Sequence, residues 1–235
     1  MDTLLKPLLL LPWPDWLALG LFFSGWWGYA HWARQRAQVR PSILATTNQW
    51  RRRWMLQATW RENRIVDSAV TQSLSASPSF FASTSILIIG GLLAALGATD
   101  KASGLVQEIP FAARTSALVF DLKLALLAAI FVHAFFRFTW SLRQYSFGAI
   151  IVGAAPEARQ FAADEAQREL FADRAGRVMG LAAETFNDGL RACYFAFAAM
   201  GWFVSPVLFA LATGGVIYVL YQREFNSDVL AVLDS

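Results

Sequence analysis

One stretch of the sequence suits a membrane helix better than any element of a soluble domain. Between Phe80 and Ala98 there is no ionisable side chain, and Ile86–Gly97 contains only apolar residues and glycine. A helix of about 20 such residues crosses the hydrocarbon core of a bilayer, which is about 30 Å thick. We therefore expect a membrane span here. Its glycines and alanines, among them Gly90 and Gly91, would let a neighbouring helix approach closely.

Further stretches of the chain have the length and composition of membrane spans. They lie at about Trp13–Ala33, Ser116–Phe136 and Ala192–Tyr221. The last is long, and we expect Pro206 to kink it because proline lacks an amide hydrogen. With 56% hydrophobic and only 16% charged residues, the composition lies outside the range of ordinary soluble domains. The sequence thus predicts an all-α fold: one membrane domain over residues 1–235, a polytopic helical bundle of four transmembrane helices with cytoplasmic helical extensions.

The distribution of Lys and Arg predicts the orientation of these spans. Eight lie in the connection of about 34–79 and seven in that of about 137–191, against two between the second and third spans and one on each terminal segment. Connections rich in basic residues stay on the cytoplasmic side. We expect a multi-pass protein of the bacterial inner (cytoplasmic) membrane, with both termini outside.

The first arginine-rich connection mixes aromatic and basic side chains, in Trp50–Trp54 and in the segment from Trp60 onward. One interpretation is that its arginines bind anionic lipid headgroups and fix the topology. The other is a docking surface in which Asn63, Arg64 and Asp67 pair with polar groups of the second connection.

Charged residues also stand at or inside the predicted spans. One helix face just before the fourth span carries Glu184, Asn187, Asp188 and Arg191. Either Asp188 and Arg191 form an intrahelical ion pair, or the arginine stands at the mouth of a water-filled path. Asp121 and Lys123 lie within the third span and point in different directions, so each needs another partner. Alternatively, the long side chain of Lys123 extends to the outer membrane–water interface and keeps its charge in water.

The residues that most often carry chemistry form no diagnostic pattern here. His31 and His133 lie toward the cytoplasmic ends of their spans, which makes a bis-histidine haem conceivable, but we expect hydrogen-bonded polar contacts and no cofactor. The single cysteine, Cys193, excludes an intrachain disulfide and a multi-cysteine metal site. Because no catalytic motif or metal-ligand spacing appears either, we do not expect an enzyme.

Ordered blocks of the sequence resemble a known family. Arg61–Asp67, which leads into Phe80–Ser85, is followed by Phe135–Tyr145 and by Phe186–Arg191. These blocks are similar to those of a bacterial and plant membrane family defined by domain of unknown function 599, and the likeness extends from Asp15 to Phe225. The resemblance implies a membrane protein but no activity and no catalytic residue. Tyrosine is the commoner residue of that family at the position of Cys193, and asparagine at that of Ser146, which implies that neither residue here is essential.

The resembling blocks all fall near the cytoplasmic ends of the predicted spans. We therefore expect their polar and aromatic residues to form one cluster there, either a functional site or a network that locks the helix ends together. Its candidate members are Arg64, Asp67, Arg137, Trp140, Arg143, Gln144, Tyr145, Asn187 and Arg191.

The expected function is a homo-oligomeric channel or small transporter in the lipid bilayer, with Asp121 or Lys123 bordering an outer vestibule. The alternative is an accessory or structural subunit of a larger membrane protein complex. Expected partners are copies of the chain or other membrane proteins, and anionic lipid headgroups at the arginine-rich connections. The small net charge of +3 gives no reason to expect nucleic acid.

Overall fold

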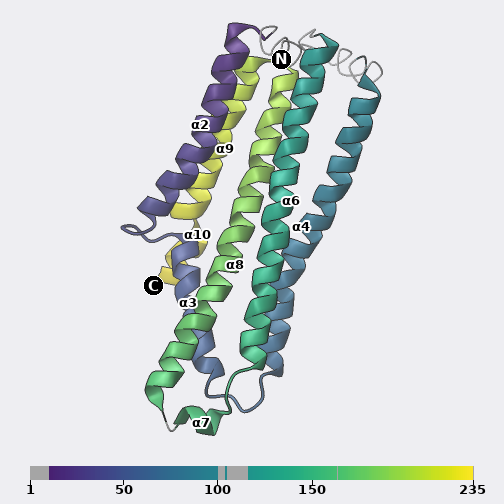
Figure 1. The fold of residues 1–235 in the computed structure, drawn as a ribbon. Coiled ribbons are helices and arrows are strands. Elements are labelled where there is room, and N and C mark those ends of the chain that lie inside the picture. The colour runs from purple at the N-terminus through teal and green to yellow at the C-terminus, as the bar shows by residue number, and fades with distance from the viewer. Residues whose placement is uncertain (1–10, 100–103, 105–115, 163, 235) are drawn as a thin grey trace, which may run out of the picture. The chain divides into compact units, whose positions relative to one another are not determined.

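The computed structural model describes residues 11–99, 104, 116–162 and 164–234, and in this part of the chain every regular element is a helix (Figure 1). This confirms the all-α class. The elements are α2 (Trp13–Arg36), α3 (Ile43–Ala58), α4 (Ile65–Gly97), α6 (Ala117–Gly153), α7 (Ala158–Ala162), α8 (Glu165–Met200), the short 3₁₀ helix η1 (Gly201–Phe203), α9 (Pro206–Phe225) and α10 (Asp228–Asp234).

The chain folds into two compact units. Unit 1 comprises Met1–Arg36, Thr84–Ala134 and Leu190–Gln222, and unit 2 comprises Ala37–Ser83, Phe135–Gly189 and Arg223–Ser235. Since α4, α6 and α8 each contribute residues to both units, this division does not test the expectation of one membrane domain.

Among the described helices, α4 and α6 are long and apolar enough to cross a membrane. They contain the predicted second and third spans. The predicted first span forms α2, a helix of 24 residues that is not among the helices long and apolar enough to cross a membrane. The count of four spans therefore stays a prediction. Lys101 and Arg114, the basic residues between the second and third spans, lie outside the described residues, as does Lys6 near the amino terminus.

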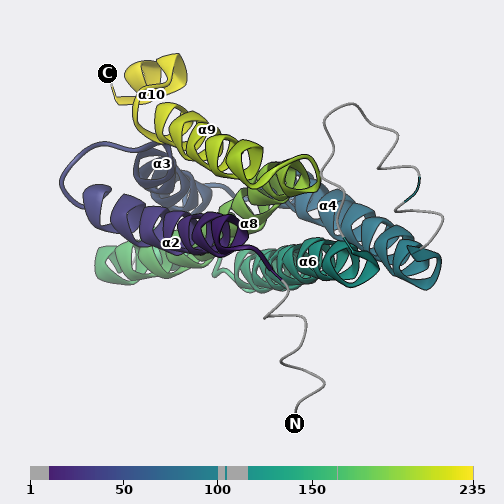
Figure 2. The same cartoon turned by 90° about the horizontal axis from the view of Figure 1, so that it is seen from above.

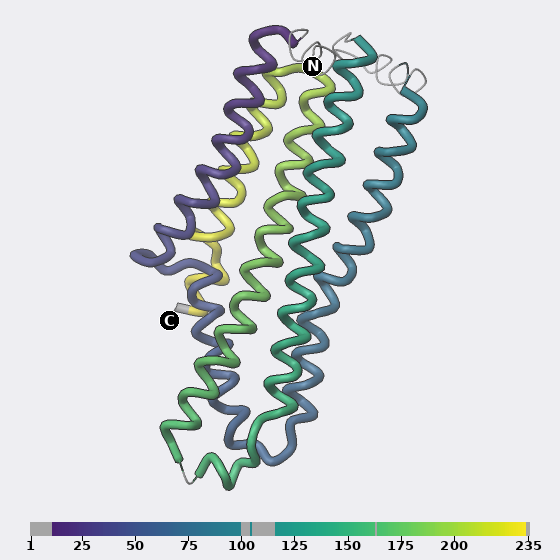
Figure 3. The backbone as a smooth tube through the Cα atoms, viewed as in Figure 1, coloured from purple at the N-terminus to yellow at the C-terminus, as the bar shows by residue number. Residues whose placement is uncertain are grey.

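The predicted fourth span, residues 192–221, does not form one kinked helix, so the expected kink at Pro206 is wrong. α8 ends at Met200, and the chain turns through η1 before α9 begins at Pro206 (Figure 3). Proline suits the first turn of a helix, where its missing amide hydrogen costs nothing. The hydroxyl of Ser205 completes the start of α9 by accepting a hydrogen bond from the backbone N–H of Leu208, at 3.0 Å.

The turn folds α9 back along α8, so that the two helices are antiparallel within unit 1. Gly201 makes the reversal possible, because a Cβ there would lie 3.3 Å from the backbone of Leu208. Trp202 stacks on Phe209 with 5.5 Å between ring centroids. Phe209 in turn packs on Phe22 of α2, at 4.9 Å, so the hairpin is held by the aromatic core of unit 1.

The part of α4 that belongs to unit 1, from Thr84 to Gly97, lies at an edge of that unit (Figure 2). Only 11% of its most apolar stretch is buried. A Cβ added at Gly90, Gly91 or Gly97 would meet no atom within 4 Å, so the small-residue face that the sequence predicts points away from the other helices.

Unit 2 is built around close packing of α3 against α8, and its core includes Met55, Tyr145 and Met179. α10 also packs on α3, and Trp50 donates a hydrogen bond to the carbonyl of Leu233 at 3.4 Å. The described carboxyl-terminal helix thus shares unit 2 with both arginine-rich connections. The sequence predicts this terminus on the other side of a membrane from those connections, and its side stays a prediction.

Candidate functional site

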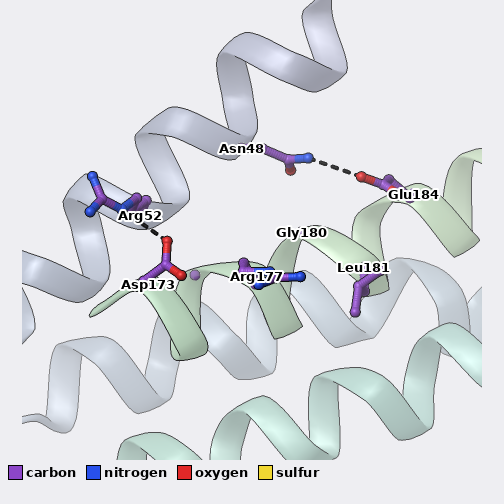
Figure 4. A pocket seen from close by; sticks show the side chains of 8 residues that line it. Asn48, Arg52, Asp173, Arg177, Gly180, Leu181 and Glu184 are labelled. Atoms are coloured by element: carbon purple, nitrogen blue, oxygen red, sulfur yellow. Dashed lines mark hydrogen bonds and ion pairs between the residues drawn. The ribbon is translucent and has the colours of Figure 1, made fainter. Parts of the chain in front are cut away.

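A polar cavity of about 280 Å³ opens between α3 and α8 of unit 2 (Figure 4). Gly176 and Gly180 of α8 face α3 across it. A Cβ on Gly176 would lie 2.8 Å from the Cα of Arg52, and one on Gly180 would lie 3.1 Å from the amide oxygen of Asn48. These glycines let two polar helix faces approach closely enough to enclose a small site.

The side chains that line the cavity pair across it. Arg52 Nε donates to Asp173 Oδ1 at 3.2 Å, and Asn48 Nδ2 donates to Glu184 Oε1, also at 3.2 Å. Arg177 completes the charged lining. The acids come from α8 and their partners from α3, as Figure 4 shows. Such a site offers both charge signs to a small polar ligand, and it also joins the two helices.

Arg51 extends this network into the protein. Its Nη1 donates to Asn48 Oδ1 at 2.8 Å and to Thr47 Oγ1 at 3.0 Å. Burial lowers the pKa of Arg51 below its ordinary value, while nearby Tyr145 and Glu184 act in the opposite direction. The guanidinium is therefore a partly desolvated cation beside a carboxylate, the kind of group that holds a polar network in one geometry.

Sequence reasoning singled out Glu184 and Tyr145 but missed the other members of this site. Arg51 and Arg52 were interpreted as headgroup anchors, and Asn48 and Asp173 belong to segments more than 100 residues apart. One available signal was the spacing of Gly176 and Gly180, since small residues four apart on a helix commonly mark a close helix contact.

Arg64, from the predicted cytoplasmic cluster, ties the two arginine-rich connections together. Its guanidinium donates to the carbonyl of Ala58 at 3.2 Å and to that of Ala155 at 2.8 Å, and it also bonds the carbonyl of Pro156. This is the pairing expected of a docking surface, and it is made to backbone groups, which holds the end of α6 against the start of α4.

Asp67 and Asn63 find their partners within the first connection instead. Asp67 is fully buried, accepts a hydrogen bond from Trp54 Nε1 at 2.7 Å and forms an ion pair with Arg61. Asn63 Oδ1 accepts from the backbone N–H of Ile65 at the start of α4. The expected pairing with the second connection is thus found for Arg64 and not for these two residues.

The remaining candidates of the cluster are dispersed. Arg137 forms an ion pair with Asp188, which links α6 to α8. Exposed Trp140 and Arg143 both contact the ring of Phe147 on α6. The buried Oε1 of Gln144 meets no hydrogen-bond donor among the described residues. Tyr145 lies in the core of unit 2, and Asn187 is half-buried. Arg191 lies in unit 1, over the ring of Tyr29.

The charges of the predicted third span lie in unit 1. Lys123 is only 2% exposed, and its Nζ donates to the carbonyl of Trp202 at 2.8 Å. Trp202 Nε1 donates to Asp15 Oδ1 at 2.5 Å, and Asp15 lies close enough to Lys123 for an electrostatic interaction. The alternative of a side chain that reaches the interface is therefore wrong for Lys123. Asp121 is half-buried and accepts a hydrogen bond from Thr99 at the end of α4.

The two histidines have separate partners in unit 1. His31 is exposed and bonds Gln35 at 2.8 Å, whereas His133 makes an edge contact with Trp26, at 5.7 Å between ring centroids. Nothing in these contacts brings the two imidazoles to a common iron. The described residues also contain no group of three or more His, Cys, Asp or Glu arranged to hold a metal ion.

Comparison with known proteins identifies a family but no activity. No curated protein and no solved structure matches the chain. A family model described as "Protein of unknown function, DUF599" matches residues 17–229, nearly the whole length, which confirms the resemblance found in the sequence. The chain therefore belongs to the DUF599 family.

Proposed function

We propose that this chain is a multi-pass protein of the cytoplasmic membrane that assembles with copies of itself through α4, and that the assembly works as a channel or small transporter. Unit 1 lies in the bilayer and unit 2, with both arginine-rich connections, in the cytoplasm. In this proposal the chain crosses the membrane along α2, α4, α6, α8 and α9, and α10 lies inside. The antiparallel course of α8 and α9 supports the additional crossing.

The observation that carries self-assembly is the exposure of α4. Its 33 residues span about 50 Å, more than the roughly 30 Å of hydrocarbon that lipid can cover. Ile65 and Val66, at the end that belongs to unit 2, are 72% and 63% exposed. The uncovered apolar and glycine-rich part of α4, from Phe80 to Gly97, favours contact with another helix, and its open glycines favour a second α4.

The positions of Lys123 and Asp121 favour a conduction pathway that lies between protomers and not within one. Lys123, Trp202 and Asp15 bond one another and fill the interior of unit 1, which leaves Lys123 no route to an outer vestibule. Asp121, half-buried at the end of α6 nearest α4, is the better candidate for a group that borders one.

A second patch favours the alternative, an accessory subunit of a larger complex. Val39, Trp50, Val229 and Val232 are exposed apolar side chains near α3 and α10 in unit 2. Self-association through α4 would leave this patch uncovered, whereas a foreign protein could cover it.

The mass of the protein purified in mild detergent tests the proposal. We expect a closed homo-oligomer that conducts ions in planar bilayers, and we expect Gly91→Leu to shift it toward monomer because the leucine keeps two α4 helices apart. Gly20→Leu is the matched control, since it adds the same side chain to α2 at a position with no atom within 4 Å.

A monomer without conductance would exclude the channel, and a stoichiometric foreign partner would support the accessory subunit. Equal masses for Gly91→Leu and wild type would exclude α4 as the contact.

A further inference from the structure

A groove of about 540 Å³ lies on unit 1 between α2 and α9. Its lining is mostly apolar and aromatic, and its floor is backbone, because Gly28 and Gly214 leave open space where a side chain would stand. Its volume is within the range of about 300–1,000 Å³ that is usual for small-molecule sites.

The two helices touch at both ends of the groove. A Cβ on Gly25 would lie 2.9 Å from Ile217 Cδ1, so the helices are in close contact there. At the other end the rings of Trp32 and Tyr221 lie 5.9 Å apart. From Ser24 to Trp32 the groove follows α2 for about 12 Å, close to the depth of one leaflet of hydrocarbon, half of about 30 Å.

The groove changes character along its length. It is lined by glycine at the Gly25 end and by Trp32, Tyr218 and Tyr221 at the other, where tryptophan and tyrosine suit the depth of lipid headgroups. Just beyond Trp32, the last turn of α2 carries Arg36, four residues on and therefore on the same face of the helix, and guanidinium groups bind phosphate well.

We propose that this groove binds an anionic phospholipid of the cytoplasmic leaflet, with one acyl chain along Gly28 and Gly214 and the phosphate near Arg36. The proposal rests on the membrane placement proposed above. A second protein helix fits less well, because the exposed rings of Trp32 and Tyr218 stand beside the glycine floor and hold another backbone away.

Native mass spectrometry of the full-length, delipidated protein tests this site. Phosphatidylglycerol and phosphatidylcholine with identical acyl chains are titrated separately, and the bound lipids per chain are counted. We expect wild type to retain one phosphatidylglycerol. Gly28→Leu and Gly214→Leu should weaken its binding on the order of tenfold, about 1.4 kcal/mol, because leucine fills the groove.

Gly20→Leu and Gly215→Leu are the matched controls, since they add leucine to the same two helices at positions outside the groove with no atom within 4 Å. We expect both to bind phosphatidylglycerol as wild type does. Equal binding by all four variants would overturn the proposal. So would a loss of oligomer mass, without loss of lipid, in Gly28→Leu and Gly214→Leu, because a second copy would then be the occupant.

The headgroup end is tested by Arg36→Gln. We expect this variant to lose the preference for phosphatidylglycerol over phosphatidylcholine while still retaining a lipid, and Arg174→Gln, an exposed arginine of unit 2, to keep the preference. An unchanged preference in Arg36→Gln would contradict the placement of the phosphate. Failure of the proposed membrane placement is distinguishable from failure of the lipid site, since the protein would then appear in the soluble fraction of broken cells.

Discussion

Lys123 is a charged residue that is almost fully buried. A buried ammonium is tolerated only where hydrogen bonds and an opposite charge compensate for lost hydration, and the carbonyl of Trp202 and the carboxylate of Asp15 meet that need. The sequence predicted that Lys123 required a partner other than Asp121, but it could not identify the partner. Asp15 and Trp202 are 187 residues apart, and only the hairpin of α8 and α9 brings them together.

Lys123→Ala should destabilise the protein by about 2–4 kcal/mol, because it leaves the Asp15 carboxylate and a buried carbonyl without their cation. Lys123→Met should cost less, since it keeps the volume of the side chain. Thermal unfolding in detergent measures both, with Arg174→Ala as the exposed control. Equal melting temperatures for Lys123→Ala and wild type would mean that the network contributes nothing to stability.

Helix α8 shows how much of an element follows from local sequence. Its apolar and small residues predicted a helix, and Pro206 predicted an interruption. A proline inside a long apolar stretch is compatible with either a kink or a new helix start. The choice depends on the packing of Trp202 on Phe209 and of Phe209 on Phe22. The α3–α8 cavity was beyond prediction for the same reason, since the facing residues are distant in the sequence.

Gly176→Ala should weaken the packing of α3 on α8 by about 1–3 kcal/mol, because the new methyl group would lie 2.8 Å from the backbone of Arg52. Gly153→Ala, also in unit 2 but with open space around it, should have little effect. Hydrogen exchange of the α3 amides reports the difference. If α3 exchanges no faster in Gly176→Ala than in Gly153→Ala, the close approach seen here is not needed for stability.

For the molecule as a whole, the sequence predicted the all-helical class and two helices long and apolar enough to cross a membrane, but not the path of the chain after Met200. Counting Lys and Arg by connection assigns sides without knowing any contact. The side of the carboxyl terminus depends on the number of crossings, so it could not follow from that count alone. Under the proposed function, α9 is a further crossing, and Arg223 and α10 then lie on the same side as the arginine-rich connections.

The most direct test of this account is labelling of single cysteines by a membrane-impermeant maleimide, in a Cys193→Ala background expressed in intact cells. Cysteines replace Trp13 at the start of α2, Arg174 in α8 and Val232 in α10, all of them exposed side chains. The account predicts labelling at position 13 without lysis, and at positions 174 and 232 only after the membrane is opened. Labelling of position 174 or 232 in intact cells would contradict it.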